Sequence, residues 1–206
     1  MAACVVLASG LSKRFGDNKL LQALFSRTVL ETVICVARSV LPDEVYVVVS
    51  PETYGRISHA SFHTGVIINK NPDEGIAGSI RTAIQEIGTS QDHILFLLGD
   101  QPFVSPNLLK RMVYESQNNP SHIVCAVFQG IRRNPAIFPR HCYSELMALK
   151  GDTGANFIIR SARRVIEVEV VNQAELFDID TPEDLQRARD LIRDRPAWMS
   201  DLSRCV

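Results

Sequence analysis

The sequence lacks any apolar run close to the ~20 residues that a membrane-spanning helix needs, and no basic segment or cleavage site precedes its first apolar stretch. Its net charge of −1 gives no general attraction to nucleic acid or anionic membranes. The five cysteines include no C-x-x-C pair, and their odd number argues against a disulfide framework. We therefore expect a cytoplasmic protein without nucleic-acid or membrane partners, in which any anion site depends on a local cluster of charge.

Internal repeats and low-complexity linkers are also missing, and 206 residues fit one domain with a large core. Hydrophobic residues make up 46% of the chain and charged residues 22%, as in ordinary globular proteins. Short apolar runs typical of buried strands alternate with segments of helical periodicity. This alternation predicts a three-layer α/β/α sandwich around a mainly parallel, Rossmann-like sheet, as one domain over residues 1–206 with a polar tail from about 194.

The expected strands cover residues 3–8, 44–49, 65–68, 93–98, 123–128 and 165–171. The expected helices cover residues 29–40, 51–58, 75–87, 106–117, 143–149, 157–159 and 182–192. The run 93–98 is the most apolar and is therefore expected in the centre of the sheet. The stretch 130–138 mixes cationic and apolar residues, and we interpret it as a substrate wall rather than a core strand.

A glycine-bearing basic loop follows the first predicted strand directly and ends at Lys19. Gly10 and Gly16 let the backbone approach a ligand closely, and Lys13 and Arg14 add positive charge to that of Lys19. The glycine spacing satisfies neither the Walker pattern nor the dinucleotide fingerprint. A polyphosphate is the natural ligand of such a loop, with a solvated surface loop as the alternative.

A carboxylate, Asp100, follows the most apolar predicted strand. Ligands of open α/β sheets bind beyond the carboxyl ends of the strands, so Asp100 is placed to hold a metal ion or a substrate; a turn cap is the alternative. Asp178 and Asp180 precede a strong helix start at Thr181-Pro182, beside a positive helix dipole. These two carboxylates suit metal or anion chemistry as well.

Three further segments carry candidate side chains. Gly78-Ser79 lies at a helix start whose free N–H groups attract phosphate or a base edge, unless the glycine merely leads into a core helix. The pair Arg132-Arg133 can bind phosphate if it faces a cleft, and it is otherwise a solvated surface pair. Asp152, in a second glycine loop, is either a turn residue or a pocket residue.

The opening loop is similar to the leader of the MobA-like nucleotidyltransferase family, Leu-Ala-Ala-Gly-x-Ser-x-Arg-Met-Gly-x-x-Lys, with Ser9 and Phe15 as its two mild departures. The family's other motifs follow in order as Gly78-Ser79, Leu98-Gly99-Asp100-Gln101-Pro102, Arg132-Arg133-Asn134-Pro135, Gly151-Asp152-Thr153-Gly154-Ala155 and Asp178-Ile179-Asp180-Thr181-Pro182. The resemblance covers about residues 3–193 and is strongest to the molybdenum cofactor cytidylyltransferase branch. That branch often has Gly in place of Arg133 and Arg in place of Asn156.

The resemblance implies catalytic roles for Arg14, Lys19 and Asp100, and a Mg²⁺ held by Asp100 and Asp180. For nucleotide and substrate binding it implies Leu7, Ala8, Ser9, Gly10, Ser12, Gly78, Ser79, Asn134 and Asp152. Lys13 is off the motif and is expected to be solvated. The implied reaction transfers a nucleoside monophosphate from an NTP, CTP first, to molybdopterin and releases pyrophosphate.

Two alternatives stay open. An enzyme of the same fold could use GTP or a sugar phosphate, although a sugar-nucleotide enzyme is expected to carry a longer chain or an extra C-terminal domain. A non-catalytic accessory protein could instead bind the cofactor and pass it to a molybdenum hydroxylase apoenzyme, which is the candidate protein partner in either case. The presence of both Asp100 and Asp180 argues against a purely accessory role.

Overall fold

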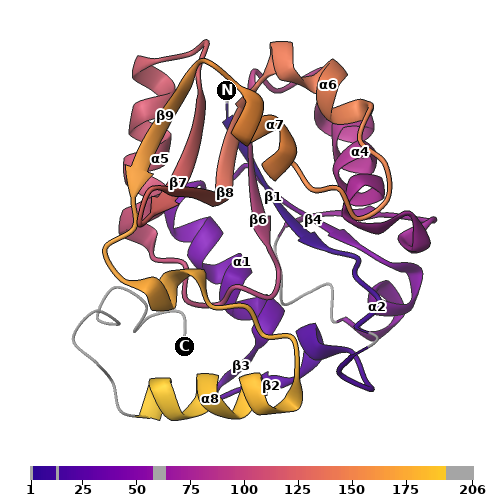
Figure 1. The fold of residues 1–206 in the computed structure, drawn as a ribbon. Helices are drawn as coiled ribbons and strands as arrows, with labels where there is room; N and C mark the ends of the chain where they lie inside the picture. Colours follow the sequence, from indigo (N-terminus) through magenta and orange to yellow (C-terminus); the bar gives the residue numbers. More distant parts are fainter. Residues whose placement is uncertain (1, 13, 58–63, 194–206) are drawn as a thin grey trace.

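The computed structural model describes residues 2–12, 14–57 and 64–193 (Figure 1). Lys13 and the tail expected from about residue 194 lie outside the described residues. Seven strands form one sheet in the order β5-β4-β1-β6-β8-β7-β9. Their bounds are Ala2–Ala8 (β1), Val45–Val49 (β4), Gly65–Ile68 (β5), His93–Leu98 (β6), Ile123–Phe128 (β7), Ile131–Pro139 (β8) and Val165–Glu169 (β9).

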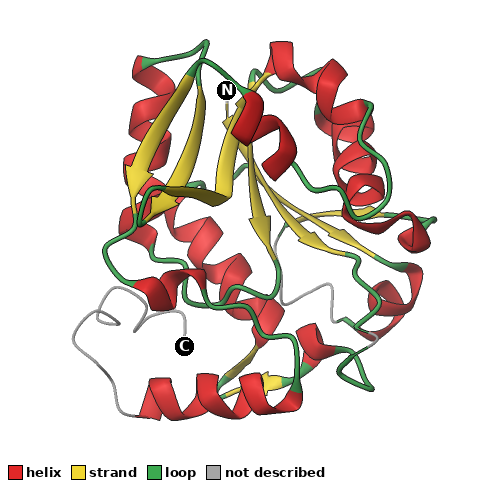
Figure 2. Ribbon diagram, in the orientation of Figure 1, coloured by secondary structure: helices red, strands yellow, loops and turns green. Residues whose placement is uncertain are grey.

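Helices cover both faces of this sheet, which confirms the predicted three-layer sandwich (Figure 2). On one face lie Val29–Val40 (α1), Pro106–Asn118 (α5) and Pro182–Arg193 (α8). On the other lie Gly75–Ile87 (α4), Tyr143–Met147 (α6) and Asn156–Ser161 (α7). Smaller elements are Lys19–Leu21 (η1), Ala23–Leu24 (β2), Arg27–Thr28 (β3), Pro51–Arg56 (α2), Pro72–Glu74 (η2), Arg140–Cys142 (η3) and Gln173–Leu176 (η4).

The sheet is mainly parallel, with β8 as the exception. β1 pairs in parallel with β4 and β6, β4 with β5, and β7 with β9. β8 runs antiparallel between β6 and β7. The interpretation of 130–138 as a wall rather than a core strand is therefore wrong, since Pro135 to Pro139 are buried inside the sheet and only the first four residues of β8 are partly or fully exposed.

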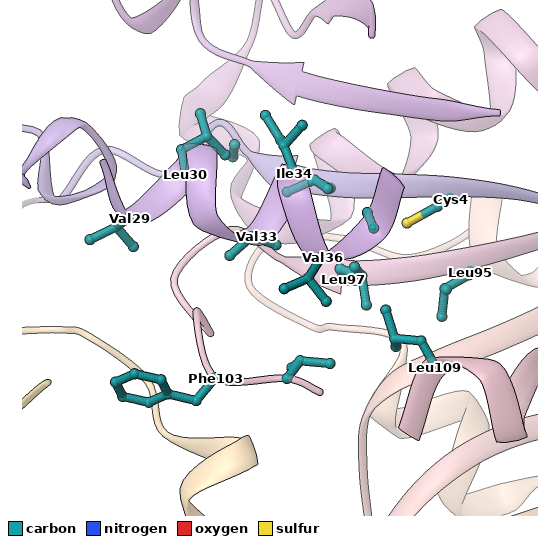
Figure 3. Packing of buried hydrophobic residues seen from close by; sticks show 14 of the residues in the cluster. Cys4, Val29, Leu30, Val33, Ile34, Val36, Leu95, Leu97, Phe103 and Leu109 are labelled. Carbon is teal, nitrogen blue, oxygen red and sulfur yellow. The ribbon is translucent and has the colours of Figure 1, made fainter. Parts of the chain in front are cut away.

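The larger core cluster packs α1 and α5 against the central strands (Figure 3). Leu30 and Val33 of α1 are buried together with Leu97 of β6 and Leu109 of α5. The start of α1 is fixed by the capping box that the sequence predicts, because the backbone N–H of Glu31 donates to Thr28 Oγ1 at 3.2 Å. Burial of such aliphatic side chains stabilises the fold by about 1.5–3 kcal/mol each.

Strand direction brings the polar loops together at one edge of the sheet. β1 and β6 are parallel neighbours in a register that sets Leu7 opposite Leu98. The loop after β1 and the turn containing Asp100 therefore leave the sheet side by side, as expected for parallel strands. Within the described ranges, no helix combines the length and the apolar character needed to cross a bilayer.

Candidate functional site

A lysine joins two carboxylates at the carboxyl edge of the sheet. Lys19 Nζ lies 2.6 Å from Asp100 Oδ2 and 2.8 Å from Asp180 Oδ1. The Lys19 side chain is only 13% exposed. Burial alone would lower the pKa of this ammonium, but the charges and hydrogen bonds of Asp100 and Asp180 outweigh it and raise the pKa above its ordinary value. Lys19 is therefore held as a cation between the two aspartates.

Backbone contacts fix the position of Asp180. The buried Ile179 donates its N–H to the Asp100 carbonyl at 3.0 Å, which ties this segment to the end of β6. One residue later, the Asp180 N–H donates to Asp184 Oδ2 at 3.1 Å. Asp184 Oδ2 also accepts from the Thr181 N–H and hydroxyl, and the Asp184 N–H donates to Thr181 Oγ1. These reciprocal hydrogen bonds cap the start of α8. The predicted helix start thus orients a carboxylate toward Lys19.

The described residues of the opening loop, on either side of Lys13, include a hydrogen-bonded turn. Ser12 adopts a positive φ of 49° and its carbonyl receives the Phe15 N–H at 2.9 Å. The Ser12 hydroxyl accepts from the Lys19 N–H at 3.3 Å. Gly16 also has a positive φ, of 80°, a conformation that explains the need for glycine there. Arg14 extends from this turn with 75% of its side chain exposed, and its Nη2 lies 3.1 Å from Asp180 Oδ2.

Two serines from distant segments meet at the side of this turn. Ser9, just after β1, and Ser79, in the first turns of α4, are both buried, and their hydroxyl oxygens are 2.5 Å apart. Asn69 donates from Nδ2 to Ser9 Oγ at 3.1 Å. Gly78 serves packing, because a Cβ at this position would lie 2.9 Å from the Glu74 Cβ.

Lys19, the two aspartates, Arg14 and the two serines line one pocket of about 490 Å³, which we call the first pocket. Its lining includes Leu7, Ala8, Ser9, Gly10, Ser12, Arg14, Lys19, Ser79, Asp100, Asp152 and Asp180. The structure therefore brings together nearly all of the sequence-predicted site residues. Gly78 and Asn134 are the exceptions, because Gly78 does not belong to this lining and Asn134 lines a separate pocket.

Several lining residues are absent from the sequence prediction. They are Leu11, Leu20, Pro72, Asp73, Gly75, Ile76 and Leu98. Gly75 has a φ of 66°, and a Cβ there would overlap Asp152 and the Gly151 backbone. The Ala77 N–H donates to the Gly151 carbonyl at 3.1 Å. The segment at Gly75 therefore contacts the loop at Gly151, and the glycines of these two segments were the sequence signal that could have indicated this part of the pocket.

A second pocket of about 520 Å³ lies beside the first, and Leu98 lines both. Its lining also contains Gln101, Phe128, Arg133, Asn134, Asn156, Gln173, Ala174, Leu176, Phe177 and Asp178. Asp178 accepts from Gln101 Nε2 at 2.8 Å. Desolvation and the charges of Asp100 and Asp180 raise the pKa of Asp178 to about 6.

The carboxylates of Asp100 and Asp180 fit a divalent cation. Both contact one ammonium, so both are within reach of one positive centre. Mg²⁺ is commonly bound by one or two carboxylates, with substrate phosphates and water completing its oxygen ligands. No group of three or more histidine, cysteine, aspartate or glutamate side chains suited to a metal occurs in the described part of the chain. A phosphate-bearing substrate would therefore have to complete the coordination.

The sheet order and the turn after β1, with Asp100 following β6 and Asp180 preceding α8, define an α/β protein of the nucleotide-diphospho-sugar transferase fold, which solved nucleotidyltransferases of low sequence identity share. The chain belongs to the MobA-like NTP transferase domain family, whose model matches residues 4–167. The resemblance to this family drawn from the sequence motifs is thereby confirmed.

Three curated relatives match most of the chain. The purine catabolism protein PucB of Bacillus subtilis is 31% identical over 90% of this chain and 94% of its own length. A probable molybdenum cofactor guanylyltransferase of Natranaerobius thermophilus is 28% identical, over 91% and 94% respectively. The molybdenum cofactor cytidylyltransferase of Escherichia coli is 22% identical, over 91% and 95%.

A solved structure of the Mycobacterium tuberculosis H37Rv protein Rv0371c in complex with manganese has the same fold. Its TM-score is 0.74 and its identity 26%, covering 92% of this chain and 98% of that one. The manganese belongs to that protein.

Proposed function

We propose that the protein is a nucleotidyltransferase that transfers a nucleoside monophosphate from an NTP to a phosphate-bearing acceptor. The observation that carries this proposal is the contact of Lys19 with both Asp100 and Asp180 beside the turn after β1. A polyphosphate in the first pocket would meet the cationic Lys19 and Arg14 together with the backbone N–H groups of that turn. The same pocket offers carboxylate oxygens for a cation that travels with the triphosphate.

The charged and polar site residues predicted from the sequence have distinct roles in this proposal. Lys19 and Arg14 bind the β- and γ-phosphates and orient the α-phosphorus. The turn from Ser9 to Ser12 lies against the triphosphate. Ser79 and Asp152, which also line the first pocket, contact the nucleoside, while Asn134 contacts the acceptor in the second pocket.

Asp100 and Asp180 would hold a divalent cation, Mg²⁺ in our proposal, in agreement with the manganese bound by the solved relative. When bound, such an ion neutralises charge on the phosphate oxygens and on the departing pyrophosphate. Because Lys19 contacts both carboxylates, a cation held there would release its ammonium to bind the phosphates.

The reaction balances without a covalent enzyme intermediate. An oxygen of the acceptor's phosphate monoester forms a bond to the α-phosphorus, and the bond from the α-phosphorus to the bridging oxygen breaks, so that pyrophosphate leaves with the electron pair. Two unit negative charges repel each other by about 1 kcal/mol at 4 Å in bulk water, and by more in a cleft. Arg14 and Lys19 offset this repulsion because they present two positive charges to the first pocket.

We propose CTP as the nucleotide and molybdopterin as the acceptor, on the strength of the motif resemblance. The names of two relatives agree on the molybdenum cofactor, which supports the acceptor. They differ on the nucleotide, since one is named a guanylyltransferase and the other a cytidylyltransferase. A molybdenum hydroxylase apoenzyme is the proposed recipient of the product. A second candidate is an accessory protein that binds the cofactor without turnover, and one relative is named a purine catabolism protein rather than a transferase.

Pyrophosphate release tests the proposal. Purified protein is supplied with Mg²⁺, molybdopterin cofactor and one of CTP, GTP, ATP or UTP. We expect release with CTP that depends on the acceptor. Release with GTP but not with CTP would identify GTP as the nucleotide and would leave the proposed class of reaction unchanged. The absence of release with all four nucleotides, although the cofactor binds, would favour the accessory role.

A further inference from the structure

The second pocket contains two buried amide oxygens with no hydrogen-bond partner. They are Gln101 Oε1 and Asn156 Oδ1, and they are unpaired among the described residues. Gln101 is only 6% exposed, so water does not readily compensate its acceptor. Buried polar atoms without a partner are rare in folded proteins and call for an explanation. Both of these residues line the same pocket, which suggests a shared ligand.

The orientation of the Gln101 amide is set by its neighbour. Gln101 Nε2 donates to the Asp178 carboxylate at 2.8 Å, and an ionised carboxylate can only accept hydrogen bonds. Turning the amide over would place its oxygen against this carboxylate. The nitrogen therefore stays on Asp178 and the oxygen is left at the pocket wall, so a molecule that pairs with it must supply a donor.

The remaining lining sets the shape and charge of that molecule. Phe128, Phe177 and Leu176 are partly buried and give the pocket apolar surface. Arg133 is exposed at the pocket and has no ion-pair or hydrogen-bond partner among the described residues. Apolar walls, acceptors and an unpaired guanidinium together suit a flat heterocycle that has N–H donors on its edge and an anionic substituent.

We infer that the second pocket recognises its ligand as a nitrogen heterocycle, with Gln101 and Asn156 accepting hydrogen bonds from adjacent N–H groups and Arg133 binding an anionic substituent. The inference rests on the proposed function, in which the acceptor lies in this pocket and its phosphate reaches the first pocket past Leu98. It adds how the acceptor is recognised, and it assigns this to two residues, Gln101 and Asn156, that have no role in the phosphate chemistry.

Two commercial heterocycles test the hydrogen-bond part. Pterin presents an amino group and a ring N–H side by side, whereas lumazine has a carbonyl oxygen in place of that amino group. Ligand fluorescence on titration with the full-length protein gives both dissociation constants. We expect pterin to bind at least about tenfold more tightly, because one buried hydrogen bond is left unmade with lumazine. Equal affinities, or no pterin binding up to its solubility limit, would overturn the inference.

Variants of Asn156 test whether this residue causes the preference for pterin over lumazine. Asn156→Leu should reduce the ratio between pterin and lumazine toward one, while Asn156→Asp, which keeps an oxygen acceptor, should retain it. Asn118→Leu on the surface of α5 is the matched control and should leave the ratio unchanged. A preference that survives in Asn156→Leu would contradict the assignment. The wild-type comparison stands by itself if a variant does not fold.

The contact between Arg133 and an anionic substituent is tested by a separate binding measurement. A carboxylated pterin should bind the wild type more tightly than pterin, and Arg133→Ala should remove this advantage, whereas Arg163→Ala at an exposed position should not. An advantage unchanged in Arg133→Ala would remove Arg133 from the inference.

Pyrophosphate release measured on the same preparations separates the two proposals. Turnover with molybdopterin but no preference for pterin over lumazine would overturn the inference and leave the proposed function in place. A clear preference for pterin without pyrophosphate release from any NTP would support the inference and contradict the proposed function.

Discussion

Lys19 Nζ lies 2.6 Å from Asp100 Oδ2, with the lysine side chain almost fully enclosed. Its ammonium also contacts Asp180, so it occupies the position between two carboxylates where we propose that a divalent cation binds. Lysine and metal therefore compete for the same oxygens until a triphosphate offers the lysine another partner. This competition implies that metal and nucleotide bind cooperatively.

Removing the lysine should change metal binding and nucleotide binding in opposite directions. In Lys19→Ala the two carboxylates lose their cation, so Mn²⁺ affinity without nucleotide should rise about tenfold or more. CTP affinity should fall, because a phosphate contact is lost. Electron paramagnetic resonance of free Mn²⁺ and calorimetry with CTP measure the two effects. Lys150→Ala, at an exposed position outside the first pocket, is the control. Unchanged or weaker Mn²⁺ binding in Lys19→Ala would contradict the competition.

Asp100→Asn should abolish turnover without unfolding the protein. The amide keeps the size of the side chain and removes the negative charge that would hold the cation, so pyrophosphate release should fall by about two orders of magnitude or more. The Tm should stay close to that of the wild type, because the residue lies at a strand end beside the pocket rather than in the core. Wild-type rates of release in this variant would argue against a role for Asp100.

The packing of α1 and α5 on the sheet predicts a large loss of stability on truncation. Leu109 is fully buried in this cluster, so Leu109→Ala should lower the free energy of unfolding by about 2–5 kcal/mol. Val171 is 81% exposed, so Val171→Ala should change it by less than about 0.5 kcal/mol. Urea denaturation followed by circular dichroism measures both. A similar loss in the two variants would contradict the described packing.

The buried cysteines should resist alkylation in the native protein. Desolvation raises the pKa of Cys125 to about 12 and that of Cys142 to about 11. The thiolate is the reactive form, and its fraction at pH 8 is then far smaller than for a free thiol of pKa about 8.5. Iodoacetamide treatment at pH 8 followed by peptide mass spectrometry should show both unmodified, and both should react in denaturant. Rapid modification of native Cys142 would contradict its burial.

The sequence predicts the strands and their carboxyl-end edge because these follow from local patterns. The β-branched run of β1 and the apolar run of β6 identify parallel core strands, and the loops that follow these strands bring Lys19 and Asp100 together. The helix start at Thr181 similarly predicts a fixed position for Asp180, although its contact with Lys19 depends on tertiary packing.

Other features depend on contacts between distant segments. β8 is inserted antiparallel between β6 and β7, and nothing in its own residues reveals this pairing. The strands β2 and β3 have two residues each, too few for a periodic pattern to show. The placement of Asn134 in the second pocket, away from Lys19, follows from the path of β8. The approach of Gly75 to Gly151 likewise appears only after folding.

The central claim is nucleotidyl transfer in the first pocket, and the mass of the product tests it most directly. The protein is incubated with Mg²⁺, CTP and molybdopterin cofactor, and the acceptor is analysed by mass spectrometry while pyrophosphate is measured. The account predicts an acceptor heavier by one cytidine monophosphate unit and one pyrophosphate for each such product. An unchanged acceptor, with no pyrophosphate from CTP or from GTP, ATP or UTP, would contradict it.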